Sequence, residues 1–212
     1  MGLNTAFAGL EAAIVKDGEI LADARTAMAR GQDKMLPEFV SGLLVEAGVE
    51  LSELDKIAVV TGPGSFTGIR IGVAYARGLA LVTQAECIGV TSIEAAIPAG
   101  MEGETMGALQ AKKRPPEQSW WVQGLTGDHG ISPPVEVDLS TLSAMLRGMN
   151  IPVFINGAEA IEESVIGLID VRPMHPSAIT AALKAADKNE QTSAPSPVYA
   201  RAPDAALPTV KT

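Results

Sequence analysis

The segment at residues 57–83 joins an apolar strand, a glycine-rich turn and a helix, and it constrains the fold more than any other feature. Residues 57–61 form a mostly β-branched apolar run, typical of a strand covered on both faces. Three glycines follow: Gly62, Gly64 and Gly68. Residues 66–83 then have the composition of a continuous helix. Because strand, tight turn and helix are the parts of a parallel crossover unit, we expect an α/β layer.

The rest of the first hundred residues predicts a strand hairpin ahead of this unit and a further strand after it. The expected strands are residues 2–6, 10–15, 19–25, 57–61 and 87–90. Residues 16–18, Lys-Asp-Gly, are a hairpin turn sequence. Apolar residues at three- and four-residue steps predict a helix over 35–47, with Asp33 as its N-cap and Gly48 at its end.

The second half repeats this order more loosely. Strands are expected at residues 106–111, 119–125, 135–138, 151–155 and 168–171, and helices at 141–147, 158–164 and 177–188. The halves resemble degenerate copies of one unit, which predicts a first lobe at residues 1–100 and a second at 101–190. Residues 191–212 contain four prolines and are expected to form a tail that either docks on the body or frays.

Charge and composition exclude several classes of protein. Sixteen Lys and Arg against twenty-five Asp and Glu give a formal charge of −9. Autonomous nucleic-acid binding is not expected, because Lys and Arg supply most of the affinity for phosphate backbones. A hydrophobic fraction of 47% is enough for a packed core.

The single cysteine and the lack of a signal-peptide pattern indicate the cellular compartment in which the protein is expected. Cys87 alone cannot form an internal disulfide, and nothing at the start of the sequence has the pattern of a signal peptide. A reducing cytoplasm is therefore expected. The long apolar stretch at residues 66–83 contains Arg70 and Arg77, so it is not expected to span a membrane.

The glycine-rich turn is the candidate for ligand chemistry. It leads into a helix N-terminus, where backbone N–H groups favour an anion, and Ser65 or Thr67 can cap that helix. Candidate anion or nucleotide contacts are Gly62, Gly64, Ser65, Thr67 and Arg70. The alternative is that the glycines only permit a tight turn.

Known catalytic and metal-binding motifs fit this sequence poorly. No lysine follows the turn as in a Walker loop, and Ser65 lacks the frame of a nucleophile elbow. His129 and His175 are far apart, and both are expected at the surface. No catalytic residue and no metal site are predicted.

Small residues recur every four positions along the helix after the turn. Gly68, Gly72, Ala76 and Ala80 form a stripe on which a second element can approach closely. That element is either this protein's own sheet or first helix, or a helix of a partner; composition does not decide between them. The candidate partner interface comprises Met35, Leu36, Phe39, Val40, Leu43, Gly68, Ile69, Gly72, Val73, Ala76 and Ala80.

At residues 62–72 the sequence Gly-Pro-Gly-Ser-Phe-Thr-Gly-Ile-Arg-Ile-Gly resembles the signature of the bacterial TsaB (YeaZ) family of tRNA threonylcarbamoyladenosine biosynthesis proteins. Four further stretches agree with that family: residues 3–6, 17–18, 36–37 and 197–204. The resemblance implies a two-lobed actin-like ATPase (ribonuclease H-like) fold, with mixed sheets flanked by helices and a degenerate second lobe.

The function implied by the resemblance is that of a non-catalytic subunit. The family supports the TsaD transferase, which places a threonylcarbamoyl group on adenosine 37 of tRNA, and a TsaE-type ATPase joins the complex. Members contact TsaD through first-lobe helices and self-associate as homodimers through the same surface when alone. No cofactor is required, and an adenine nucleotide at the subunit junction is an open alternative.

This chain departs from the pattern of the family where the superfold holds Mg²⁺ and phosphates. Asn4 stands in place of an aspartate, residues 110–113 lack an expected acid, and residues 156–158 offer only Asn-Gly-Ala. Residues 31–33 lack a histidine often seen before the first helix. Independent ATP hydrolysis is therefore not expected, since carboxylates hold Mg²⁺. The alternative function is a nucleotide-dependent transferase or a glycoprotease-like peptidase of the same superfold.

Overall fold

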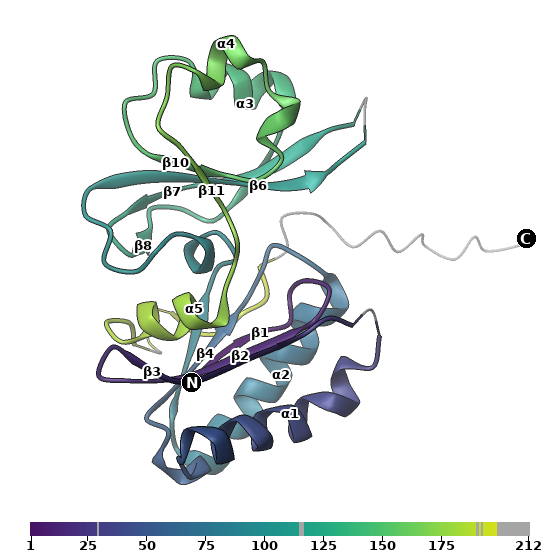
Figure 1. Ribbon diagram of the computed structural model, residues 1–212, viewed down its shortest axis with the longest axis vertical. Helices are drawn as coiled ribbons and strands as arrows, with labels where there is room; N and C mark the ends of the chain where they lie inside the picture. Colours follow the sequence, from purple (N-terminus) through teal and green to yellow (C-terminus); the bar gives the residue numbers. More distant parts are fainter. Residues whose placement is uncertain (29, 115–116, 190, 192, 199–212) are drawn as a thin grey trace, which may run out of the picture.

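Two lobes are stacked along the long axis of the molecule in the computed structural model (Figure 1). The structure describes residues 1–28, 30–114, 117–189, 191 and 193–198. Each lobe is a mixed sheet flanked by helices, as the sequence predicts. No helix in these described ranges has both the length and the apolar character needed to cross a membrane.

The first lobe contains a five-stranded sheet with the order β3-β2-β1-β4-β5. Its elements are β1 (Gly2–Asn4), β2 (Leu10–Lys16), β3 (Glu19–Thr26), α1 (Gln32–Ala47), η1 (Leu51–Glu53), β4 (Lys56–Val60), α2 (Phe66–Thr83), β5 (Glu86–Val90) and η2 (Glu94–Ala96). β1, β2 and β3 pair antiparallel, whereas β4 lies parallel to both β1 and β5. The predicted hairpin and crossover units are confirmed.

The start of α1 differs from the prediction. Gly31, in the left-handed conformation at φ 84°, is the N-cap, and Asp33 lies inside the first turn. The amide of Gln32 donates hydrogen bonds to the carbonyls of Phe7 and Gly9 and so anchors the helix start to the β1–β2 turn. These tertiary bonds replace the side-chain cap that local sequence predicts at Asp33. Gly48 ends the helix as expected.

The second lobe contains a six-stranded sheet with the path β11-β10-β6-β7-β8 and with β9 paired to β7. Its elements are β6 (Glu104–Lys112), β7 (Ser119–Thr126), β8 (His129–Gly130), β9 (Val135–Asp138), α3 (Leu139–Leu146), β10 (Val153–Ile155), η3 (Ala158–Ala160), α4 (Glu163–Ile166) and β11 (Val171–Pro173). Trp120, completely buried on β7, is the largest core side chain. The helix predicted at 158–164 is divided into η3 and α4 by extended backbone at Ile161.

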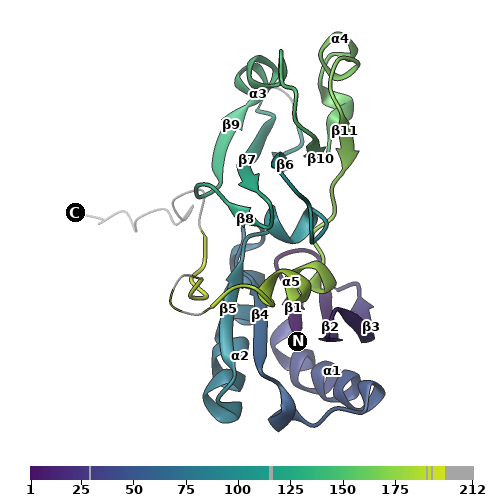
Figure 2. The same cartoon turned by 90° about the vertical axis from the view of Figure 1, so that its left-hand side faces the viewer.

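The last helix, α5 (Ala178–Ala185), packs on the first lobe rather than the second. It covers the face of the first sheet opposite α1 and α2 (Figure 2). Ala181 and Ala185 belong to the first-lobe core. The expectation that residues 101–190 form one second lobe is corrected here, because the chain returns to the first sheet before residue 178.

Two ion pairs with buried lysines connect α5 and the segment that follows it to the junction between the lobes. Lys184 Nζ lies 3.2 Å from Asp128 Oδ1, and Lys188 Nζ donates to Glu94 Oε1 at 2.7 Å. Burial alone would raise the pKa of Glu94, but Lys188 and the N–H groups of Thr91 and Gly130 outweigh it and hold that pKa below the usual value of a glutamate. Burial lowers the pKa of Lys184, which Asp128 partly opposes.

The described part of the C-terminal tail docks on the first lobe. The N–H of Gly89 donates to the carbonyl of Ser193 at 2.7 Å, and the N–H of Val198 donates to the carbonyl of Thr61 at 2.8 Å. Of the two expected alternatives for the tail, docking therefore holds for residues 193–198. The remainder of the predicted motif at 197–204 lies outside the described residues.

Glu94→Gln is expected to lower the free energy of unfolding by about 3 kcal/mol near neutral pH, because Lys188 stays buried without a counter-charge. Since the pKa of Glu94 is lowered in the folded protein, its contribution is complete above the pKa of glutamate in the unfolded chain and is lost as the pH falls through the lowered pKa. The difference from the parent protein should therefore shrink in acid. Urea denaturation of both proteins, near neutral pH and in acid, measures the difference in their free energies of unfolding.

Asp170→Asn is the matched control, because the ion pair of Asp170 with Arg172 is exposed. It should leave the denaturation midpoint nearly unchanged. A Glu94→Gln loss that is absent, or equal at both pH values, would contradict the assignment of this pair.

Candidate functional site

The turn before α2 is tied to the β1–β2 turn by a short backbone hydrogen bond. The N–H of Ser65 donates to the carbonyl of Ala6 at 2.7 Å. The hydroxyl of Ser65 accepts from the N–H of Gly68 at 3.3 Å and caps α2. Of the two predicted caps, Ser65 is therefore confirmed, and Thr67 lies in the first turn with an exposed side chain.

Gly62 is required by both its conformation and its surroundings. Its φ of +103° is rarely adopted by residues with a side chain. A Cβ at this position would lie 2.8 Å from the carbonyl oxygen of Val198 and 2.7 Å from Cδ1 of Ile69. The first glycine of the signature thus lets the docked tail and α2 meet at the end of β4.

Gly68 and Gly72 bring α2 into direct contact with Thr5, immediately after β1. A Cβ at Gly68 would lie 2.0 Å from the Thr5 carbonyl oxygen, and one at Gly72 would lie 2.2 Å from Thr5 Oγ1. The Thr5 hydroxyl donates to the carbonyl of Gly68 at 2.7 Å. The four-residue spacing of these glycines is therefore explained by packing against the protein's own first strand.

This contact corrects the predicted partner interface. The predicted interface residues that are buried in the core of the first lobe are Leu36, Val40, Leu43, Gly68, Ile69, Gly72, Val73 and Ala76. Their side chains cannot reach a partner in this conformation. Met35 is 43% exposed, and Phe39 and Ala80 are partly buried. The small-residue stripe faces inward because only small residues let α2 lie this close to β1.

Apolar residues that the sequence reasoning missed lie on the outer sides of α1 and α2. Val45 is 80% exposed near the end of α1, and Leu81 and Val82 are 79% and 76% exposed near the end of α2. Residues 79–82 are four consecutive apolar residues. Because successive helix residues turn by about 100°, such a run covers every side of the helix and must include solvent-facing positions. This run of four apolar residues is the feature of the sequence that could have indicated exposed apolar side chains on α2.

The N-terminal turn of α2 presents an aromatic and a cation at the surface. The guanidinium of Arg70 lies 3.8 Å from the ring centroid of Phe66, in cation–π contact. Ser65 and Thr67 are exposed beside them, whereas Gly62 is buried. Anion contact by Ser65, Thr67 and Arg70 remains a prediction.

Asn4 and Asn156, which the resemblance places where metal and phosphate contacts would be expected, make internal hydrogen bonds. The amide of Asn4 donates to Glu11 Oε2 at 3.1 Å and to the Pro176 carbonyl at 3.2 Å. In the second lobe, Asn156 Oδ1 accepts from the N–H of Gln110 at 2.6 Å. Within the described ranges, no group of three or more His, Cys, Asp or Glu side chains could hold a metal ion.

Comparison with known proteins identifies relatives in one tRNA modification pathway. A family model described as TsaD, tRNA N6-adenosine threonylcarbamoyltransferase, matches residues 25–111. The Escherichia coli protein named tRNA threonylcarbamoyladenosine biosynthesis protein TsaB is 33% identical over 93 residues, which cover 44% of this chain and only 40% of that protein. An uncharacterized Mycobacterium tuberculosis protein is 28% identical over 209 residues, covering 97% of this chain and 92% of its own.

Solved structures agree on the fold. YeaZ from Pseudomonas aeruginosa superimposes with a TM-score of 0.63 at 22% identity, covering 93% of this chain and 97% of that one. A ROK hexokinase from Thermus thermophilus has a TM-score of 0.53 at 13% identity, covering 87% and 96% of the two chains. The expected two-lobed, actin-like fold class is confirmed.

Gly72→Ala is expected to destabilise the fold by about 1–3 kcal/mol, because the added methyl group would meet Thr5 Oγ1. Adding Thr5→Ala should restore part of the loss. Gly78→Ala is the matched control on the same helix, since nothing lies within 4 Å of a Cβ there. It should stabilise by about 0.5–1 kcal/mol. Chemical denaturation measures all three, and equal effects at Gly72 and Gly78 would refute the packing role.

Proposed function

Since this chain is a relative of the TsaB (YeaZ) proteins, we propose that it acts in tRNA threonylcarbamoyladenosine biosynthesis as a non-catalytic subunit that binds a TsaD-type transferase. The names of its relatives and the TsaD family match over residues 25–111 support a role in this pathway. Binding to the transferase is the further step of the proposal, and it rests on the surface of the first lobe.

The observation that carries the proposal is the set of exposed apolar residues near the C-terminal ends of α1 and α2. Val45, Leu81 and Val82 are each more than three-quarters exposed. Apolar side chains that protrude in this way from rigid helices supply the desolvated contacts of protein interfaces. The inner sides of both helices are anchored in the core, so the outer sides are presented in a fixed arrangement. We call Val45, Leu81 and Val82 the outer helix surface.

A supporting rather than catalytic role fits the chemistry of the junction between the lobes. Asn4 replaces the acid expected there, and its amide is engaged with Glu11 and with the backbone. A net charge of −9 suits a subunit that leaves the tRNA to its partner. The transfer reaction is therefore assigned to the TsaD-type subunit.

The proposal extends to three further associations. A TsaE-type ATPase joins the complex, and the chain alone forms a homodimer through the outer helix surface. An adenine nucleotide would lodge at the junction with the transferase, where Arg70 and the N-terminal turn of α2 are exposed.

Val45→Asp combined with Leu81→Asp should weaken binding to the transferase by roughly tenfold or more, because both changes place a charge in an apolar contact. Thermal stability should hardly change, since both side chains are largely in solvent. Titration calorimetry with the TsaD-type protein of the same organism measures the affinity. Mass spectrometry of bulk tRNA, in a gene deletion supplied with each variant, measures the modification.

Leu168→Asp is the matched control, because Leu168 is 83% exposed in the second lobe. It should keep both binding and modification. If parent protein and transferase form no complex, or if the double variant binds as tightly as Leu168→Asp, then the proposed interface is wrong.

The isolated chain should neither bind Mg-ATP tightly nor turn it over, since no carboxylate stands at Asn4 to hold the metal. Titration calorimetry and a phosphate-release assay measure these properties. Tight binding, with turnover abolished by Ser65→Ala, would instead support the nucleotide-dependent enzyme.

A further inference from the structure

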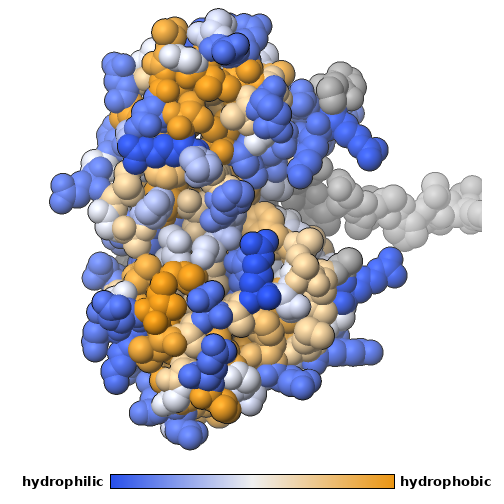
Figure 3. Space-filling view, in the orientation of Figure 1, coloured by the Kyte–Doolittle hydropathy of each residue, from blue (hydrophilic) through white to orange (hydrophobic). Residues whose placement is uncertain are grey.

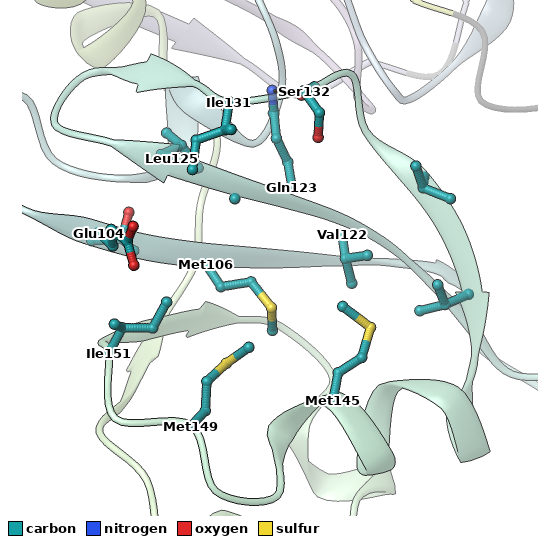
Figure 4. A pocket seen from close by; sticks show the side chains of 14 residues that line it. Glu104, Met106, Val122, Gln123, Leu125, Ile131, Ser132, Met145, Met149 and Ile151 are labelled. Atoms are coloured by element: carbon teal, nitrogen blue, oxygen red, sulfur yellow. Dashed lines mark hydrogen bonds between the residues drawn. The ribbon is translucent and has the colours of Figure 1, made fainter.

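The second lobe contains an apolar cavity of about 400 Å³ that has no part in the proposed function. Met106 and Val122 line it from β6 and β7, and Met145 and Met149 line it from α3 and the segment after that helix. The side chains of the three methionines converge on the space between sheet and helix (Figure 4). Apolar side chains gather on the surface over this part of the second lobe (Figure 3).

The cavity exists because one side chain is missing from a row of apolar residues. Trp120, Val122 and Gly124 alternate along β7 and so share one face of the sheet. Gly124 pairs with Met106 in the register. A Cβ at Gly124 would make only an ordinary 3.5 Å contact, with Ile131 Cδ1. The space beside Gly124 is therefore open, and a side chain placed there would occupy it without moving the backbone.

One wall of the cavity, formed by β7 and the loop at residues 131–132, is held in place by hydrogen bonds. The N–H of Ile131 donates to the carbonyl of Gly124 at 2.9 Å. The amide of Gln123 donates to the carbonyl of Ser132 at 2.8 Å, which fixes the same loop. A cavity with one hydrogen-bonded wall and a volume within the usual range of about 300–1,000 Å³ is suited to a small molecule.

The residues around the cavity specify the chemistry of that molecule. Thioether groups adapt to and contact aromatic rings favourably, which suits a flat apolar body. Glu104 is the charged residue among the described residues that line the cavity, and its side chain is exposed. Ile131 and Met145 are 63% and 39% exposed, so the cavity is open to solvent. A ligand with a cationic end would complement the carboxylate.

We propose that this cavity binds a small ligand with an aromatic body and a cationic group at one end. The test uses two probes of the same shape, 2-naphthylmethylamine, which is protonated at neutral pH, and neutral 2-naphthylmethanol. The full chain is labelled with carbon-13 at its methionine methyl groups, and each probe is titrated by NMR. The amine should shift the signals of Met106, Met145 and Met149 to saturation and leave Met35 in the first lobe unchanged.

Variants separate the apolar and charged parts of the site. Gly124→Leu should weaken the binding of both probes by about tenfold or more, because its side chain fills the cavity. Glu104→Gln should weaken the binding of the amine by about threefold and leave the binding of the alcohol unaffected, as expected for an exposed charge. Gly78→Ala, on the surface of the first lobe, should bind both probes like the parent.

Gly124→Ala is the second variant, in case Gly124→Leu does not fold. Its methyl group would lie at an ordinary 3.5 Å from Ile131 Cδ1, and it should weaken binding to a smaller extent. Absence of saturable shifts, or unchanged affinity in a folded Gly124→Leu variant, would overturn the proposal. Equal affinity for amine and alcohol, with no effect of Glu104→Gln, would overturn the cationic class. If the transferase rather than the amine shifts these methyl signals, the cavity receives a partner's side chain and the proposal is wrong.

Discussion

The close contact between α2 and the residue that follows β1 is the constraint on which the first lobe depends. Thr5 donates from its hydroxyl to the carbonyl of Gly68, and a side chain at Gly68 or Gly72 would collide with Thr5. Because α2 cannot lie this close to β1 with any larger residue, the signature sequence is accounted for first by packing. On the opposite face of β1, Gly2 meets the backbone of Ala178 in α5 in the same way. The sheet is thus held tightly between helices at its central strand.

This packing decides which sides of the first-lobe helices are available for function. The buried residues of α2 lie between positions 68 and 76, whereas the apolar residues Leu81 and Val82 are largely exposed and have no role in the core. Val45, near the end of α1, is exposed in the same way. A rigid inner contact and an exposed apolar outer surface are what a docking subunit requires. The ion pairs of Lys184 in α5 and of Lys188 just after it similarly link this part of the chain to the junction between the lobes. The proposed role as a subunit rests on this arrangement, in which the inner sides of the helices form the core and the outer sides carry exposed apolar residues.

Most of the first lobe could be predicted from the sequence, because its signals are local. The hairpin turn at residues 16–18, the β-branched strand at 57–61 and the cap at Ser65 each depend on neighbouring residues. The small-residue stripe was visible, but spacing alone did not reveal which element it faces. The return of α5 to the first sheet was missed because it depends on contacts distant in sequence. Lysines usually lie in solvent, so the burial of Lys184 in α5 and of Lys188 just after it could not be predicted either.

Hydrogen–deuterium exchange of the chain, alone and with the proposed TsaD-type partner, tests the central claim most directly. The account predicts that amides in the inward-facing part of α2, around Gly68 and Gly72, are already protected without the partner. Adding the partner should slow exchange in the last turns of α1 and α2, around Val45 and Leu81. Partner-dependent protection confined to the second lobe, or none in either helix, would contradict the account.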